Sequence, residues 1–320
     1  MDKYISQKYF TDLTNLKHTL DTYGVAIIPN LLNTQECHDM LQGLWDYFTH
    51  ITQNWETPIT KDNPSSWKLI HTLFPLHSML IQHWGIGHCQ AVWNVRQNPK
   101  IIEVFSHLWN TNDLLVSFDG ASFNMPPETT GRGWNRNNTW FHCDQSFTNN
   151  EFTCVQSWVT ALDVNPGDAT LSFLEGSHQY HGELAKTFGI TDKTDWYKLN
   201  REQEEFYLDK GCSHQKISCP SGSLVLWDSR TIHCGTEAFR ERTNPNQRAV
   251  IYLCYMPRSL AKPGALKKRR KAFNELRMTT HLAHKPKLFP VNPRTYGNPI
   301  PNINPVSTPE LNEIGLKLID

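Results

Sequence analysis

The chain has 320 residues, 38% of them hydrophobic, and its 31 basic and 31 acidic side chains cancel to a formal net charge of zero. This composition supports a sizeable core and argues against a disordered chain. The sequence contains no apolar run of about 18 residues, which excludes a membrane-spanning helix. The start, MDKYISQKYF, lacks the apolar stretch of a secretory signal. The eight cysteines are irregularly spaced without a CxxC pair, so a reducing, cytoplasmic setting is expected.

Residues 1–112 are predicted to be mainly helical. Apolar residues recur at helical spacing from Tyr9 to Tyr23, and Gly24 is expected to end that helix. A short strand follows at residues 25–29, where β-branched residues precede a proline. Asn33 and Glu36 form a capping-box pattern that predicts a second helix, ending near residue 48. Residues 53–67 read as a loop, and helix and loop continue over 68–110.

The sequence pattern of residues 113–256 is typical of a β-sheet core. Short apolar segments are separated by turns rich in glycine, proline and asparagine, which favours an antiparallel sandwich or barrel. A helical insertion is predicted at 179–210. The expected strands are 114–118, 121–125, 139–142, 154–162, 170–174, 214–218, 223–227 and 248–256.

Residues 257–320 are predicted to hold a basic helix, over 265–282, and a Pro/Asn-rich tail with little regular structure, over 285–309. Between Arg258 and Pro301 the sequence has eleven basic residues and one acidic residue, so this segment carries about +10 and the remainder about −10. Such asymmetry is typical either of a solvated basic helix or of a surface that binds an acidic partner. The run Lys267–Lys271 also fits a nuclear localisation signal.

Three residues form a candidate metal site. His142 and Asp144 are two positions apart at a strand end, so their side chains point to the same face. His233 follows 91 residues after His142, after a glycine turn and a buried strand. Two histidines and one carboxylate are the facial triad of non-haem Fe(II) enzymes. A further residue, Arg248, begins the last apolar strand and offers a planar fork suited to a carboxylate.

With these motifs the chain resembles the phytanoyl-CoA dioxygenase family of Fe(II)/2-oxoglutarate oxygenases. The resemblance covers most of the chain, and the segments that carry it are 23–30, 115–119, 141–145, 174–178 and 226–233. It implies one oxygenase domain over 1–320: a mainly β, double-stranded β-helix (a cupin-like jelly roll) with N-terminal helices as a buttress and a C-terminal basic helix.

The resemblance also implies roles for individual residues. His142, Asp144 and His233 match the iron ligands, and Arg248 matches the arginine that pairs with the distal carboxylate of 2-oxoglutarate. The turn before Arg248 is longer than is common in the family, so Arg240 and Arg242 remain alternatives. Two residues match positions that often line the 2-oxoglutarate pocket, Thr139 and Trp158. Two others are expected to be structural turn residues, Gln145 and His178.

The expected function is therefore that of an Fe(II)- and 2-oxoglutarate-dependent dioxygenase, with O₂ as oxidant and ascorbate as an optional reductant. Because Asp144 occupies the position where related halogenases have a small residue, hydroxylation is expected, or an oxidation of the same mechanism such as desaturation. A small or lipid-like substrate, conceivably anionic, is favoured. One alternative keeps this chemistry but holds a nucleic acid or an acidic protein on the basic segment 258–301. A second is a non-oxidative, cupin-like metal-binding protein.

Overall fold

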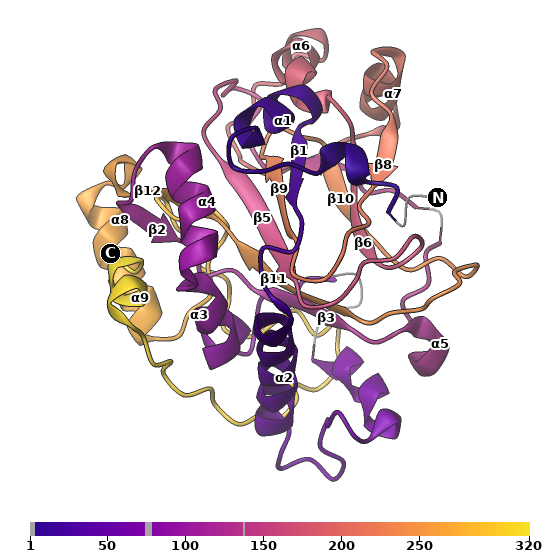
Figure 1. The fold of residues 1–320 in the computed structure, drawn as a ribbon, viewed down its shortest axis with the longest axis vertical. Helices are drawn as coiled ribbons and strands as arrows, with labels where there is room; N and C mark the ends of the chain where they lie inside the picture. Colours follow the sequence, from indigo (N-terminus) through magenta and orange to yellow (C-terminus); the bar gives the residue numbers. More distant parts are fainter. Residues whose placement is uncertain (1–3, 74–78, 137) are drawn as a thin grey trace.

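Two five-stranded antiparallel sheets pack against each other in a computed structural model of the chain, which describes residues 4–73, 79–136 and 138–320 (Figure 1). The larger sheet has the order β1-β9-β5-β11-β3. Its strands are β1 (Val25–Ile28), β9 (Leu224–Asp228), β5 (Val155–Thr160), β11 (Arg248–Leu253) and β3 (Ala121–Asn124). The second sheet has the order β7-β4-β10-β6-β8. Its strands are β7 (Tyr197–Lys198), β4 (His142–Cys143), β10 (His233–Thr236), β6 (Thr170–Leu174) and β8 (His214–Lys216).

This double sheet confirms the predicted mainly β, jelly-roll fold. A further two-stranded sheet pairs β12 (Tyr255–Pro257) with β2 (Leu114–Val116). Residues 74–78 of the predicted 68–110 segment and residue 137 of the predicted glycine- and asparagine-rich loop lie outside the described residues.

The larger sheet is buried on both faces, which explains its nearly continuous apolar strands. In β9, Leu224 and Leu226 pack toward the helices, whereas Val225 and Trp227 point between the two sheets. The same alternation follows from the two-residue period of every strand. Figure 1 shows α2 and α3 beside the larger sheet, with α4 next to the β12–β2 pair. These helices supply much of the core on that side.

The helices comprise a group that precedes the sheets and others inserted between or after the strands. The first group is α1 (Leu16–Tyr23), α2 (Thr34–Ile51), α3 (Gln90–Arg96) and α4 (Pro99–Trp109). The others are α5 (Pro127–Thr130), α6 (His181–Thr187), α7 (Arg201–Asp209), α8 (Pro263–Asn274) and α9 (Glu313–Lys317). Short 3-10 helices span Gln7–Tyr9, Pro64–Thr72, Ile86–His88, Ser177–Tyr180 and Arg258–Leu260.

Two helix ends agree with the sequence prediction. The side chain of Asn33 accepts a hydrogen bond from the Glu36 backbone N–H at 2.9 Å, and the Glu36 carboxylate accepts one from the Asn33 N–H at 2.7 Å. This reciprocal capping box confirms the predicted start of α2. Gly24 ends α1 with a left-handed φ of +78°. A Cβ there would lie 2.5 Å from the Thr231 hydroxyl, so only glycine fits this close approach.

The first helix is shorter than predicted. It begins at Leu16 rather than Tyr9, because Phe10 instead forms a parallel bridge with Ile27 of β1. The Thr11 N–H donates to the Ile27 carbonyl at 2.8 Å, which commits this segment to the sheet edge. The first apolar residues of this pattern therefore form a bridge to β1 and a short 3-10 helix instead of an α-helix.

Three other boundaries also differ. The predicted strand 139–142 contracts to β4, and the predicted strand 248–256 divides into β11 and β12, which pair with different partners. The predicted basic helix 265–282 ends at Asn274, since Leu276 takes a left-handed φ of +50°. Beyond it the chain runs alongside Phe118, whose backbone exchanges hydrogen bonds with Thr279 at 3.0 and 3.1 Å.

The tail over 285–309 has little regular structure, as predicted. It returns to the end of α2, where the Asn304 N–H donates to the Ile51 carbonyl at 2.9 Å and the Trp55 indole donates to the Asn302 carbonyl at 2.6 Å. No helix among the described residues combines the length and the apolar character needed to cross a bilayer.

Candidate metal centre

Two neighbouring strands of the second sheet carry the three predicted ligands. His142 on β4 lies directly opposite His233 on β10, and Asp144 follows His142 by two residues. Their ligand atoms all lie within 4.8 Å of one another. The Asp144 Oδ2 is 3.7 Å from the His142 Nε2 and 3.4 Å from the His233 Nε2. Three donors grouped on one side of a common point match the facial triad of non-haem iron.

Backbone carbonyls orient both imidazoles. The Nδ1 of His233 lies 2.9 Å from the Thr231 carbonyl, and the Nδ1 of His142 lies 3.4 Å from the Trp140 carbonyl. A carbonyl accepts only, so Nδ1 carries the proton and the Nε2 lone pair is left for a metal. The Gln156 amide donates to Asp144 Oδ2 at 3.1 Å and holds that carboxylate in place.

The surroundings of His142 and Asp144 favour the protonation states in which these side chains bind a metal. Burial and the neighbouring His233 lower the pKa of His142, although Asp144 acts in the opposite direction. Burial by itself raises the pKa of Asp144, but His142 and His233 outweigh it and hold this pKa well below its usual range. A neutral imidazole and an ionised carboxylate are the forms in which these groups bind a metal.

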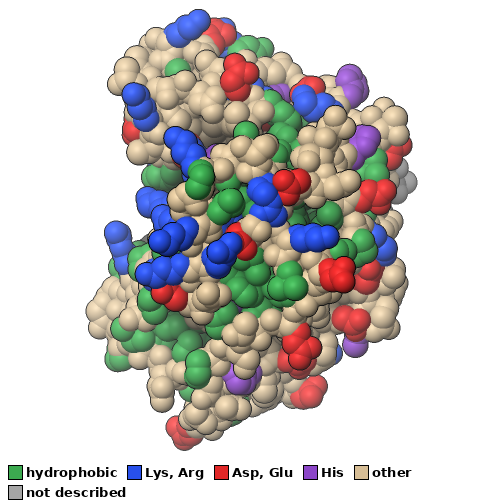
Figure 2. Space-filling model, turned by 90° about the vertical axis from the view of Figure 1, so that its left-hand side faces the viewer, with side chains coloured by type: hydrophobic (Ala, Val, Ile, Leu, Met, Phe, Trp, Pro, Cys, Tyr) green, Lys and Arg blue, Asp and Glu red, His purple; other side chains and the backbone are tan. Residues whose placement is uncertain are grey.

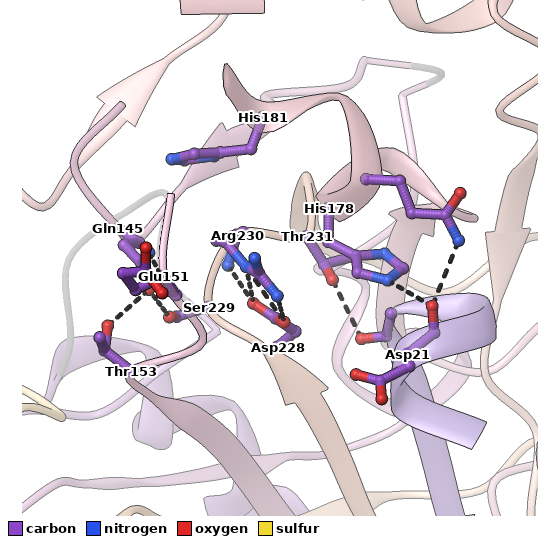
Figure 3. Close-up of polar contacts among 12 residues, drawn as sticks. Asp21, Gln145, Glu151, Thr153, His178, His181, Asp228, Ser229, Arg230 and Thr231 are labelled. Atoms are coloured by element: carbon purple, nitrogen blue, oxygen red, sulfur yellow. Dashed lines mark hydrogen bonds and ion pairs between the residues drawn. The ribbon is translucent and has the colours of Figure 1, made fainter. Parts of the chain in front are cut away.

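The turn between β9 and β10, which precedes His233, is hydrogen-bonded to Gln145, the residue after Asp144 (Figure 3). The Gln145 side-chain oxygen accepts hydrogen bonds from Ser229 at 2.7 Å and Thr153 at 3.0 Å. This glutamine thus ties the loop after Asp144 to the turn before His233. It is a structural residue, as predicted.

The same turn is braced on its other side. Figure 3 shows Arg230 directed at Asp228, to which its guanidinium donates from two nitrogens, and the Thr231 hydroxyl donates to the Gly24 carbonyl at 3.0 Å. His178 points away from the triad, with its Nε2 3.0 Å from the Asp21 carbonyl. The predicted structural role of His178 is therefore confirmed.

Arg248 begins β11 and is buried on the inner face of the larger sheet. Its Nε donates to the Ser122 hydroxyl at 3.1 Å and its Nη1 to the Ala169 carbonyl at 3.0 Å. None of the ion pairs found among the described residues involves Arg248, so its positive charge has neutral partners only. A pocket opens beside it, lined among others by Asn124, Met125, Ala169 and Arg248.

The two alternative arginines are committed elsewhere. Arg242 forms ion pairs with both Glu128 and Asp168. Arg240 lies over the Trp134 ring, 4.8 Å from its centroid. Arg240 is exposed, and Arg242 is already paired, so Arg248 is the one of the three that is both buried and without an ion pair among the described residues.

The two residues expected to line the 2-oxoglutarate pocket lie in different surroundings. Trp158 is buried between the sheets, 5.2 Å from the Arg248 guanidinium, and its indole N–H has no partner among the described residues. Thr139 is exposed and donates its hydroxyl to Glu204 at 3.2 Å. That position argues against the cofactor contact expected for Thr139, because the β4 strand is shorter than predicted and Thr139 lies outside it.

The interior offers unsatisfied donors that a carboxylate-bearing ligand would complete. The indole N–H groups of Trp158 and Trp227 are buried without a partner among the described residues. Unpaired buried donors are costly and rare in folded proteins. Together with the charge of Arg248, they fit an anionic ligand held between the two sheets, where the Trp158 ring adjoins Arg248 and the Trp227 ring adjoins His233.

Three residues near the triad had escaped sequence reasoning. Gln156 bonds Asp144, buried Asp119 lies close enough to interact electrostatically with it, and the Trp196 ring lies 6.0 Å from that of His142. For Gln156 the alternation of β5 was the available signal, since it shares a face with Trp158. Trp196 had no signal, because it lies outside the strands and the β7 strand that follows it is only two residues long.

The fold and the triad define a metal-binding jelly roll of the non-haem iron oxygenase type. A sequence profile of phytanoyl-CoA dioxygenase (PhyH) matches residues 20–240, more than two thirds of the chain. The chain belongs to this family. Fe(II) and 2-oxoglutarate are accordingly its cofactor and co-substrate, and the His-Asp-His donor set fits the metal.

Known proteins agree with this assignment. The chain is 28% identical over 242 residues to the Ava biosynthesis cluster protein O of Aspergillus versicolor, covering 73% of this chain and 75% of that protein. The structure of GlcNAc Inducible Gene 2 from Candida albicans is similar with a TM-score of 0.56 at 15% identity, over 86% of this chain and 68% of that one. The α-ketoglutarate-dependent carbocyclase SnoK from nogalamycin biosynthesis has a TM-score of 0.51 at 15% identity, over 77% and 86%. These two structures support the fold.

Proposed function

We propose that the chain hydroxylates an unactivated C–H bond of a small organic molecule, as an Fe(II)- and 2-oxoglutarate-dependent dioxygenase. The observation that carries the proposal is a clustered triad and a buried Arg248 without an ion pair among the described residues, with Trp227 against His233 and Trp158 against Arg248 between the sheets. His142, Asp144 and His233 would hold Fe(II), and Arg248 would bind the distal carboxylate of 2-oxoglutarate. When bound, iron and 2-oxoglutarate would supply the electrons that activate dioxygen for attack on a C–H bond.

The residues of the chain act by binding, orientation and exclusion of water. The carbonyls of Trp140 and Thr231 keep each Nδ1 protonated, so that both Nε2 atoms face one point. Asp144 supplies a ligand that leaves no vacancy for a halide at its own position, which supports hydroxylation over halogenation. The buried interior strengthens the attraction between Arg248 and a carboxylate by lowering the local dielectric constant.

The alternative of a macromolecular substrate receives less support. Figure 2 shows Lys and Arg side chains gathered on the face that carries α8, with acidic residues among them. Arg269 is buried, and several other cations of this segment pair with carboxylates of the chain, namely Arg258 with Asp113, Arg270 with Asp320, Lys271 with Glu275 and Lys285 with Asp195. Three of these carboxylates lie outside the segment, so pairing reduces its charge from about +10 to about +7. Arg269 of α8 donates to the Val116 carbonyl of β2, so this helix packs on a different sheet from the one that carries the triad.

The experiment is Fe(II)-dependent conversion of 2-oxoglutarate to succinate by the purified chain, measured across a library of small molecules. A substrate should raise succinate formation and gain one oxygen atom, seen by mass spectrometry. Loss of two hydrogens would instead identify a desaturase. Metal binding without any consumption of 2-oxoglutarate would favour the cupin-like, non-oxidative alternative.

A further inference from the structure

An exposed tryptophan stands beside the candidate metal centre. The Trp196 side chain is 54% exposed, although its ring centroid lies only 6.0 Å from that of His142. A large apolar ring exposed next to a reactive centre is a common mark of a ligand surface, since exposure of such a ring to water is unfavourable. Leu208, on α7 of the same insertion, is similarly exposed at 51%, but it lies on a helix without a metal ligand.

Trp196 directly precedes the strand that pairs with the His142 strand. In the β4–β7 pair, His142 lies opposite Lys198 and Cys143 opposite Tyr197. Trp196 is the residue before β7, and Asp144 is the residue after β4. The Trp196 ring centroid lies 6.0 Å from that of His142, so the indole is directed toward the metal side of this strand pair.

The loop that carries Trp196 is tied down on both sides. The Asp195 carboxylate pairs with Lys285 of the C-terminal segment at 2.8 Å. The Thr194 hydroxyl donates to the Trp196 carbonyl at 3.2 Å, and the Ser146 hydroxyl donates to the Asp192 carbonyl at 3.0 Å. The ring is thus held in place before a ligand arrives, which reduces the entropy lost on binding.

A second aromatic ring adjoins the first. Trp140 stacks on His142 at 4.7 Å between centroids with an interplanar angle of 9°, and 38% of its side chain is exposed. His142 thus contacts two indoles, both of which are partly exposed. Flat rings pack well on indole faces, gaining about 0.5–1.5 kcal/mol beyond their buried area, whereas an acyclic chain gains only the area term.

We propose that Trp196 is a specificity-determining platform on which a planar, ring-bearing small molecule stacks above the metal centre. This inference rests on the proposed function for its position near the reacting centre and narrows the substrate to aromatic or fused-ring compounds. The ring system would lie against the Trp196 indole and present an edge or a substituent toward the point shared by the three ligands.

The test is calorimetric titration of the full chain with Fe(II) and 2-oxoglutarate under anaerobic conditions, so that binding is measured without turnover. The probes are 2-naphthol and decan-1-ol, which have equal carbon numbers and one hydroxyl each. We expect 2-naphthol to bind at least about tenfold more tightly, corresponding to about 1.4 kcal/mol. Equal affinities, or no binding of 2-naphthol, would overturn the proposal.

Variants assign the preference to the platform. Trp196→Ala should weaken 2-naphthol about tenfold, whereas Trp196→Phe, which keeps a flat ring, should stay within about threefold. Leu208→Ala is the matched control for loss of an exposed apolar side chain in the same insertion and should bind as the wild type does. Unchanged affinity in Trp196→Ala would refute the role of the indole.

The two proposals can fail separately. The same titrations in the metal-free chain report on the platform alone, whereas an Fe(II) titration without probe reports on the triad. A planar preference that depends on Trp196 in a chain that binds no Fe(II) would refute the proposed function and leave the platform intact. Tight binding of Fe(II) and 2-oxoglutarate without a preference for 2-naphthol would refute the platform and leave the proposed function intact.

Discussion

His142 and His233 face each other across adjacent antiparallel strands, as a direct cross-strand pair whose ring centroids are 4.4 Å apart. The two residues are 91 positions apart in the sequence, and the pairing of β4 with β10 brings them together. Two imidazoles so close would repel each other if both were protonated. Burial and this neighbouring imidazole lower the pKa of His142, and the ionised Asp144 completes a donor set suited to a divalent cation.

Removal of a triad ligand should abolish metal binding. For His142→Ala or His233→Ala we expect Fe(II) affinity, measured by anaerobic titration, to fall more than about 100-fold, beyond the range typical of outer partners. Asp144→Ala should lose affinity and substrate oxidation together. The matched control is His178→Ala, which removes a buried histidine bonded to a carbonyl and should retain Fe(II) binding. Full activity in Asp144→Ala would show that this carboxylate is not a ligand.

Deletion of Arg248 should weaken 2-oxoglutarate rather than the metal. Its guanidinium is buried and pairs with no carboxylate of the described chain, so a bidentate partner would gain a few kcal/mol (about 2–5). We expect Arg248→Ala to raise the KM for 2-oxoglutarate at least about tenfold, which is 1.4 kcal/mol, with Fe(II) affinity nearly unchanged. Steady-state succinate formation measures it.

Arg242→Ala provides the comparison for that experiment. Since Arg242 already pairs with Glu128 and Asp168, its loss should affect stability more than the KM for 2-oxoglutarate. A larger rise of KM in Arg242→Ala than in Arg248→Ala would transfer the carboxylate-binding role to Arg242.

The basic run of α8 should divide into one essential arginine and several dispensable cations. Arg269 is 0% exposed and donates to the carbonyls of Ile319, Ala283, Val116 and Leu318 at 2.6–3.0 Å. Arg269→Ala would leave these buried acceptors unsatisfied, and we expect a loss of at least about 3 kcal/mol of unfolding free energy. Arg270→Ala breaks an exposed pair and should cost less than about 1 kcal/mol. Urea denaturation compares them, and equal losses would contradict this division.

Acid should destabilise the fold through buried neutral histidines. Burial, aided by Arg96, lowers the pKa of His88 from 6.5 to about 3, although a hydrogen bond to the Arg277 carbonyl opposes the shift. A folded-state pKa below the unfolded one means that the unfolded chain binds more protons between these values. The stability that His88 contributes is therefore present above pH 6.5 and is lost as the pH falls toward 3.

This pH dependence can be assigned to His88 with one variant and one control. In His88→Gln, the fall of unfolding free energy between pH 6.5 and pH 4 should be shallower than in the wild type, whatever the absolute stability of the variant. His18→Gln is the matched control, because it makes the same substitution at an exposed histidine. Denaturant melts at several pH values measure both. An unaltered slope in His88→Gln would assign the acid sensitivity to other groups.

The local sequence alone determined much of the site. Side chains alternate along strands, so the two-residue spacing of His142 and Asp144 already implied a shared face. The apolar strand at 224–227, the capping box of Asn33 and Glu36 and the stop at Gly24 are likewise local signals. They could be predicted because backbone geometry and hydrogen bonding within a few residues decide them.

Only the tertiary structure decided the features that depend on distant partners. Within five consecutive basic residues, Arg269 is buried because the C-terminal carbonyls converge on it, whereas its neighbours remain exposed. Arg242 pairs with the carboxylates of two distant residues, and these pairs distinguish it from Arg248. Trp196 lies near His142 because it directly precedes a two-residue strand, and the pairing of that strand with β4 has no counterpart in local sequence. Long-range pairing selects among locally equivalent residues, so spacing alone could not identify these roles.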